Sequence, residues 1–199
     1  MIFGSPYPDI PIPKQPLTEF VLQRAIELAD KPALIEGISN TIITYKQLTE
    51  SIHKVAFGLA VRGFSKSDVL AIYSPNLPEY AIAFHAVATL GGIITTVNPS
   101  YTAEELAYQL NDAGAKYLIT IPDLVTQALE AVDRSKVEEI FVFGEASGAT
   151  SFSVLLEGEG EIPKVQINLQ EDLVALLYSS GTTGMPKGVM HTLRGYKKG

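Results

Sequence analysis

The feature that most constrains the fold of this chain is an alternation of short apolar strands with helices between residues 68 and 144. Strands are predicted at 68–74, 93–98, 115–120 and 138–144, and helices at 77–92, 102–114 and 122–133. Strands separated by single helices favour right-handed crossovers onto a sheet whose strands run parallel, with helices on its faces. The sequence therefore predicts an α/β fold with a largely parallel sheet.

Two capping boxes mark helix starts. In each, a Thr side chain and the side chain of a Gln or Glu three residues later accept hydrogen bonds from each other's backbone N–H groups. Thr44 with Gln47 begins one predicted helix, and Thr102 with Glu105 begins another. Gly114 ends the second helix, because glycine readily adopts the left-handed conformation found there.

The N-terminal part follows a different pattern. Residues 1–16 hold five prolines and are predicted to be extended. An amphipathic helix is predicted over 17–30 with Thr18 as its N-cap, and a strand pair over 32–37 and 41–45.

Composition excludes several classes of protein. The chain has 199 residues, 46% of them hydrophobic, which suits one globular domain. It contains no cysteine, so disulfides and thiolate chemistry are excluded. No stretch reaches the ~20 apolar residues of a membrane span, and the N-terminus lacks a signal-peptide pattern. His53, His85 and His191 lie without metal-ligand spacing, and His85 is expected to be a hydrogen-bonded core residue.

Charge is unevenly distributed along the chain. Residues 1–172 carry 11 Lys and Arg against 22 Asp and Glu, whereas residues 173–199 carry four cations and no acid. An acidic body argues against nucleic-acid binding, which depends on many cationic contacts to phosphates. The basic end is either a solvated tail or a site for an anion such as a polyphosphate.

The segment with the most candidate binding residues is YSSGTTGMPKGV at residues 178–189, named here the phosphate-loop segment. It combines hydroxyl donors, glycines that let backbone N–H groups converge on an anion, and one cation. Pro186 and Gly188 stand where a Walker loop needs Gly and Ser or Thr, so a Walker-type NTPase is disfavoured. The plain alternative is a hairpin connection, but four hydroxyls, three glycines and a lysine are denser than a hairpin requires.

The phosphate-loop segment resembles the signature of the adenylate-forming superfamily, which includes acyl-CoA synthetases, 4-coumarate–CoA ligases and luciferase-like enzymes. Further stretches resemble the 4-coumarate–CoA ligase and luciferase-like branch: ITYKQL at 43–48, SPNLPEYAIAFHAVATLGG at 74–92 and VNPSYTAEELAYQLNDAGAKYLIT at 97–120. The resemblance extends from near residue 17 to about 192.

The resemblance implies a two-step reaction. A carboxylate attacks the α-phosphate of ATP to give an acyl-adenylate and pyrophosphate, and coenzyme A then displaces AMP to form a thioester. Mg²⁺ is expected to accompany ATP. The resemblance assigns no catalytic residue or metal ligand, and it assigns phosphate binding to Ser179, Ser180, Gly181, Thr182, Thr183, Gly184 and Lys187.

The resemblance also predicts the domain organisation. Residues 1–16 are expected to lead into a partial AMP-binding (N-terminal) domain, 17–199, that ends just after the phosphate-loop segment. The family's acid pocket, adenine and ribose contacts and C-terminal domain come later and are expected to be absent here. We therefore predict a marginally stable chain without ligase activity.

Two functional hypotheses follow. The chain is either a fragment of a carboxylic acid–CoA ligase or a catalytically inactive ATP-binding or regulatory fragment. The expected substrate is a small carboxylic acid, hydroxycinnamate-like or fatty. No nucleic acid or membrane is expected as partner, whereas a complementing C-terminal chain or self-association is. The expected compartment is the cytoplasm, or the peroxisome in a eukaryote.

Overall fold

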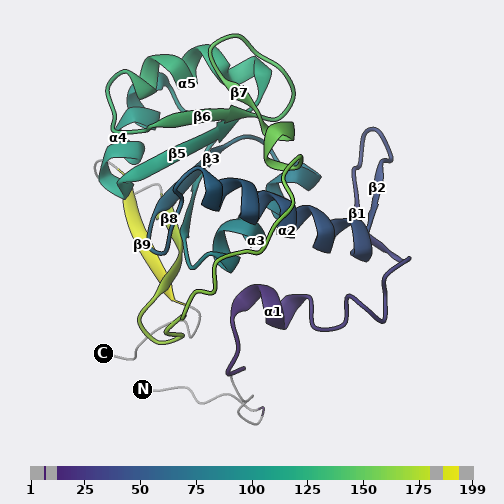
Figure 1. Ribbon diagram of the computed structural model, residues 1–199. Helices are drawn as coiled ribbons and strands as arrows, with labels where there is room; N and C mark the ends of the chain where they lie inside the picture. The colour runs from purple at the N-terminus through teal and green to yellow at the C-terminus, as the bar shows by residue number, and fades with distance from the viewer. Residues whose placement is uncertain (1–6, 8–12, 180–185, 193–199) are drawn as a thin grey trace.

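The computed structural model describes residues 7, 13–179 and 186–192 (Figure 1). Its helical elements are α1 Leu17–Val21, α2 Tyr45–Val61, α3 Pro78–Thr89, α4 Ala103–Ala113, α5 Val125–Val132 and the 3-10 turns η1 Pro122–Leu124 and η2 Phe152–Leu155. Its strands are β1 Pro32–Ile35, β2 Ile42–Thr44, β3 Val69–Tyr73, β4 Ile93–Val97, β5 Ala115–Thr120, β6 Glu139–Val142, β7 Thr150–Ser151, β8 Leu173–Ser179 and β9 Lys187–Thr192.

The predicted parallel sheet is confirmed. Within the described residues it has the strand order β7-β6-β5-β3-β4-β8-β9, and all neighbours pair in parallel except β8 and β9, which are antiparallel. The expected strand pair near the N-terminus forms a separate antiparallel hairpin, β1-β2.

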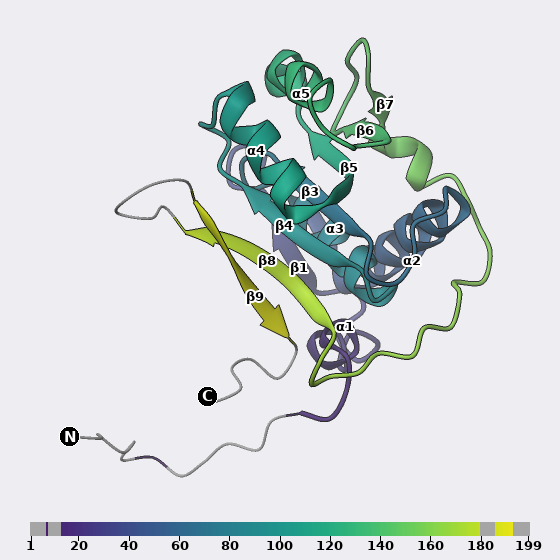
Figure 2. The same ribbon diagram turned by 90° about the vertical axis from the view of Figure 1, so that its left-hand side faces the viewer.

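Helices cover both faces of the sheet, which gives three layers (Figures 1 and 2). Leu70 and Ile72 of β3 belong to the core beneath α2 and α3. Ala71 and Tyr73 of the same strand belong to the core beneath α4 and α5. This alternation buries β3 on both sides, as expected for a central parallel strand.

Both predicted capping boxes are present. The Thr44 hydroxyl accepts from the Gln47 N–H, and the Gln47 side chain accepts from the Thr44 N–H, at the start of α2. Thr102 and Glu105 make the same exchange at the start of α4. Gly114 follows α4 with φ 64°, a left-handed conformation that glycine adopts without steric cost.

Two helix predictions need correction. The helix expected over 17–30 is regular only in α1, and Pro16 rather than Thr18 holds the N-cap position. The residues that follow form irregular turns in which Ile26 is 93% exposed. Because short helices need a buried apolar face for stability, the amphipathic pattern does not suffice there. The helix expected over 122–133 is divided into η1 and α5.

Thr18 makes a tertiary contact instead of capping the helix. Its hydroxyl donates to the His85 carbonyl oxygen at 3.2 Å and lies 3.1 Å from His85 Nδ1. This contact joins α1 to α3. The predicted hydrogen bonding of His85 is confirmed, but the residue is partly buried and does not belong to the core. Burial lowers the pKa of His85, because the charged imidazolium loses hydration.

Strand β8 enters the sheet between β4 and β9, far along the chain from its neighbour β4. An ion pair holds its start: Lys66 Nζ lies 2.6 Å from Asp172 Oδ2 and donates to the Gln166 carbonyl oxygen at 2.8 Å. Burial opposes ionisation of Asp172, but hydrogen bonds from Lys66 and the Asn168 N–H outweigh it and lower the pKa of Asp172. The strand that leads into the phosphate-loop segment is therefore fixed at its N-terminal end.

Candidate functional site

The two strands that flank the predicted phosphate-binding residues form an antiparallel hairpin. Ser179, the last residue of β8, pairs with Lys187, the first residue of β9. Both are exposed. The site residues between them, Ser180, Gly181, Thr182, Thr183 and Gly184, lie outside the described residues. The structure thus pairs the residue at one end of the predicted set with the lysine at the other in the strand register.

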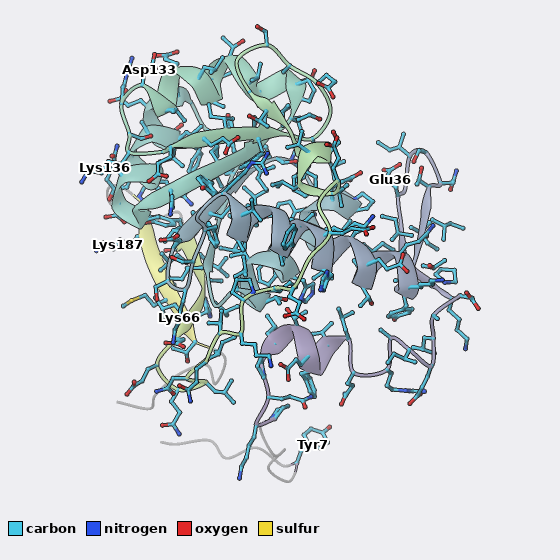
Figure 3. All side chains as sticks on the ribbon, in the orientation of Figure 1. Tyr7, Glu36, Lys66, Asp133, Lys136 and Lys187 are labelled. Carbon is cyan, nitrogen blue, oxygen red and sulfur yellow. The ribbon has the colours of Figure 1, made fainter. Side chains whose placement is uncertain are left out.

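This hairpin geometry agrees with the plain alternative of a hairpin connection and is equally compatible with anion binding. Figure 3 shows Lys187 at the outer edge of the sheet, beside β9. An exposed cation opposite an exposed hydroxyl fits a polyphosphate, whose oxygens accept from both. The described ends of the segment therefore have the donor chemistry that phosphate binding requires.

Strand β8 ends, at Ser179, at the carboxyl edge of the parallel sheet, because β8 runs parallel to β4. The chain leaves β3 toward α3 on one face and leaves β4 toward α4 on the other. This divergence is a topological switch point, where ligands of open α/β sheets bind in the crevice outside the strand ends. The phosphate-loop segment starts one strand away from that point.

A hollow of about 500 Å³ lies at the switch point. It is lined by neutral side chains, three of them tyrosines: Ser74, Pro75, Asn76, Tyr80, Thr96, Val97, Asn98, Pro99, Tyr101, Gln109 and Tyr178. Burial raises the pKa of Tyr80, against a hydrogen bond with Thr96 that lowers it. Because the lining contains no Asp, Glu, Lys or Arg, the hollow suits an uncharged organic group better than a phosphate.

Tyr178 connects the hollow to the hairpin. Its hydroxyl donates to Asp112 Oδ2 of α4 at 2.6 Å. Its ring lies over Gly188 of β9, where an added Cβ would come within 3.1 Å of the ring. Burial raises the pKa of Tyr178 far above its ordinary value, and the hydrogen bond to the Asp112 carboxylate and its charge add to the effect.

A second polar chain joins α4 to β8. Gln109 Nε2 donates to Thr95 Oγ1 at 2.8 Å and to the Thr96 carbonyl oxygen at 3.0 Å. Thr95 Oγ1 in turn donates to the Leu176 carbonyl oxygen at 3.0 Å. Both Gln109 and Thr95 are buried, and Gln109 Oε1 has no hydrogen-bond partner among the described residues.

Sequence reasoning missed Asp112, Thr95 and Gln109, and it gave Tyr178 no role. The only signal for Tyr178 was its place at the start of the phosphate-loop segment. Asp112 lies 66 residues earlier on a helix, and no local pattern predicts that this helix would pack beside β8. His191 of β9, to which no role was assigned, pairs with Ala175 of β8.

In the part of the chain that the structure describes, no helix has the length and apolar character needed to cross a membrane. Within the same residues, no group of three or more His, Cys, Asp or Glu side chains is arranged to hold a metal ion.

Comparison with known proteins shows extensive similarity to CoA ligases. The chain is 39% identical over 197 residues to 4-coumarate:CoA ligase 1 of Petunia hybrida, a match that covers 98% of this chain and 36% of the relative. It is 40% identical over 199 residues to 4-coumarate–CoA ligase CCL1 of Humulus lupulus, with the same two coverages. The chain thus spans little more than a third of the length of these relatives.

Structural similarity agrees with the sequence matches. The long-chain-fatty-acid-CoA ligase FadD1 of Archaeoglobus fulgidus superposes with a TM-score of 0.84 at 27% identity, covering 96% of this chain and 39% of that protein. The family model for AMP-binding enzymes matches residues 22–197, which include all seven residues predicted to bind phosphate. This chain therefore belongs to the AMP-binding enzyme family.

Proposed function

We propose that this chain supplies the ATP-phosphate site of a carboxylic acid–CoA ligase, an enzyme that forms an acyl-adenylate from ATP and an acid and then a thioester with coenzyme A. The observation that carries the proposal is the hairpin that sets Ser179 opposite Lys187 at the carboxyl edge of the sheet. Membership in the family and the 39% identity to a 4-coumarate:CoA ligase support it.

In this proposal the phosphate-loop segment neutralises and orients the β- and γ-phosphates of ATP. Lys187 supplies the full charge, and Ser179 a hydroxyl donor. By family resemblance, Ser180, Gly181, Thr182, Thr183 and Gly184 complete the set, and Mg²⁺ accompanies the nucleotide. Such a site acts by fixed charge and orientation, which stabilise the transition state without reorganisation during the reaction.

The neutral hollow beside β3 and β4 would hold an organic part of a substrate. Its tyrosines and prolines offer apolar surface, and Asn76 and Gln109 offer amide groups. A hydroxycinnamate-like acid and a fatty acid remain the proposed substrate classes. Relatives of both kinds occur among the comparisons, a 4-coumarate:CoA ligase and a long-chain-fatty-acid-CoA ligase.

The second candidate function is ATP binding without ligase activity. It is favoured by the exposed edge strand β9, where Met190 is 70% exposed and Val189 37%. An edge strand with apolar side chains is a surface for pairing. We propose that a complementing C-terminal chain or a second copy covers it.

Acid-dependent exchange of pyrophosphate into ATP tests the first candidate. The purified chain, shown to be folded by circular dichroism, is assayed with a panel of aryl and fatty acids beside Lys187→Ala. Exchange that falls by at least about tenfold in the variant supports the ligase proposal, since a charge-assisted contact contributes roughly 1.5–3 kcal/mol.

The same protein is titrated with MgATP. Binding that weakens in Lys187→Ala, without exchange for any acid, supports the second candidate. Neither exchange nor MgATP binding in the folded chain contradicts both.

A further inference from the structure

Helix α4 contacts strand β8 through two separate sets of hydrogen bonds. One runs from Gln109 through Thr95 to the Leu176 carbonyl oxygen, in the middle of β8. The other joins Asp112 directly to Tyr178, one residue before the end of β8. The first contact is buried, whereas the second lies at the surface, at the first residue of the phosphate-loop segment.

The Tyr178 side chain touches three elements at once. It belongs to β8, its ring covers Gly188 of β9, and its hydroxyl is bound by Asp112 of α4. Tyr178 pairs with Gly188 in the antiparallel register, one position before the pair formed by Ser179 and Lys187. Movement of either strand end relative to α4 must therefore break the hydrogen bond or displace the ring.

We infer that Asp112 and Tyr178 are positioning residues that hold both ends of the phosphate-loop segment in register with the body of the sheet. Neither needs to touch the nucleotide. Their effect on phosphate binding rests on the proposed function, whereas their effect on the hairpin does not. Preorganised donors bind an anion more tightly because less ordering is needed at the moment of binding.

The first arm of the test measures amide hydrogen exchange in the ligand-free chain. Tyr178→Phe keeps the ring and removes the hydroxyl, and Asp112→Ala removes the acceptor. Each is expected to speed amide hydrogen exchange in peptides covering 173–179 and 187–192 by about threefold to tenfold, because the loss of one hydrogen bond lowers the free energy of local opening by a corresponding amount. Exchange in β3 and β5 should not change.

The double variant and a conservative variant separate the contact from general damage. Tyr178→Phe combined with Asp112→Ala should exchange no faster than either single variant, because both remove the same bond. Asp112→Asn keeps an acceptor oxygen and should lie between wild type and Asp112→Ala. Tyr117→Phe is the matched control, since its hydroxyl donates to the Arg62 carbonyl oxygen, away from β8. It should lower the melting temperature without changing exchange in the hairpin.

The second arm measures the dissociation constant for MgATP. Tyr178→Phe and Asp112→Ala should weaken binding by about threefold to tenfold and Tyr117→Phe should leave it unchanged. If the wild-type chain binds no MgATP, the proposed function fails. The amide hydrogen exchange measurement then still tests whether the contact between Asp112 and Tyr178 holds the hairpin. Additive effects in the double variant, or faster exchange throughout the sheet, would overturn the inference.

Discussion

Single residues at the end of β8 and the start of β9 are constrained by their neighbours as much as by a ligand. Gly188 belongs to the phosphate-loop segment, where its presence suggests backbone that approaches an anion. The structure gives a second reason, because the Tyr178 ring occupies the space where a side chain would begin. Part of this sequence signature therefore reflects packing between strands.

Gly188→Ala is expected to destabilise the hairpin, because the new Cβ would lie 3.1 Å from the Tyr178 ring. Overpacking of this kind costs about 1–3 kcal/mol where the neighbour cannot move freely. Urea unfolding measures the change. Gly37→Ala is the matched control, since a Cβ added there would meet nothing within 4 Å, and it should be neutral. Equal stability of the two variants would contradict the packing argument.

His85 provides a residue-level prediction for mild acid. Its pKa is lowered by burial, so the unfolded chain takes up a proton at a higher pH than the folded chain does. Stability should therefore fall as pH drops through about 6.5, the ordinary value for histidine. His85→Gln should flatten the dependence of the urea midpoint on pH between about 7.5 and 5.5, the interval around that value. An unchanged slope would show that His85 does not cause the loss of stability in mild acid.

At the scale of elements, α4 does more than cover the sheet. Its Gln109 side chain orients the Thr95 hydroxyl, which in turn binds the backbone of β8. Buried polar groups that satisfy each other in this way fix a unique arrangement, and each unmade bond is costly. The position of β8 therefore depends on side chains of α4 and β4 as well as on backbone pairing.

Thr95→Val should cost about 1–3 kcal/mol of stability, because it removes a hydroxyl that both accepts from Gln109 and donates to Leu176. Gln109→Leu should cost less, since it removes the unpartnered Oε1 together with the donor and leaves Thr95 its bond to Leu176. Urea unfolding of both variants checks the order. The reverse order would mean that the amide, not the hydroxyl, carries the contact.

Elements whose ends carry local signals were predictable from the sequence. The capping boxes at Thr44 and Thr102 and the strand over 115–120 are where the pattern placed them. The helix expected over 17–30 was too long because amphipathicity does not report whether a partner surface exists. The same limit applies to the site: the residue types of the phosphate-loop segment suggest phosphate binding, which stays a prediction, whereas the α4 contacts depend on tertiary packing and have no local signal.

At the scale of the whole molecule, several tyrosines and a lysine have raised pKa values, and all of these shifts affect stability in alkaline solution in the same direction. Burial raises the pKa values of Tyr73, Tyr80, Tyr117 and Tyr178. A hydrogen bond to Asp68 raises the pKa of Lys116. In each case the folded chain keeps a proton that the unfolded chain releases, so the contribution to stability is complete below the unfolded pKa and declines above it.

Stability should therefore fall as pH rises from about 9 to 11, near the ordinary pKa values of tyrosine and lysine. Urea midpoints over that interval measure the fall. Tyr178→Phe should reduce the slope, because it removes the tyrosine with the largest shift among these groups. A flat profile would mean that the phenols ionise equally easily in both states.

The place of β8 in the sheet has a consequence for the order of assembly. Strands β3 to β6 come from residues 69–142, whereas the bond from Thr95 to Leu176 spans 81 residues. Closing a long chain segment is slow, because its entropy is lost before the contact forms. During synthesis, β3 to β6 emerge and can pair before β8 exists. The strand that leads into the phosphate-loop segment therefore joins the sheet after β3 to β6, and the nucleotide binding proposed above would require that later step.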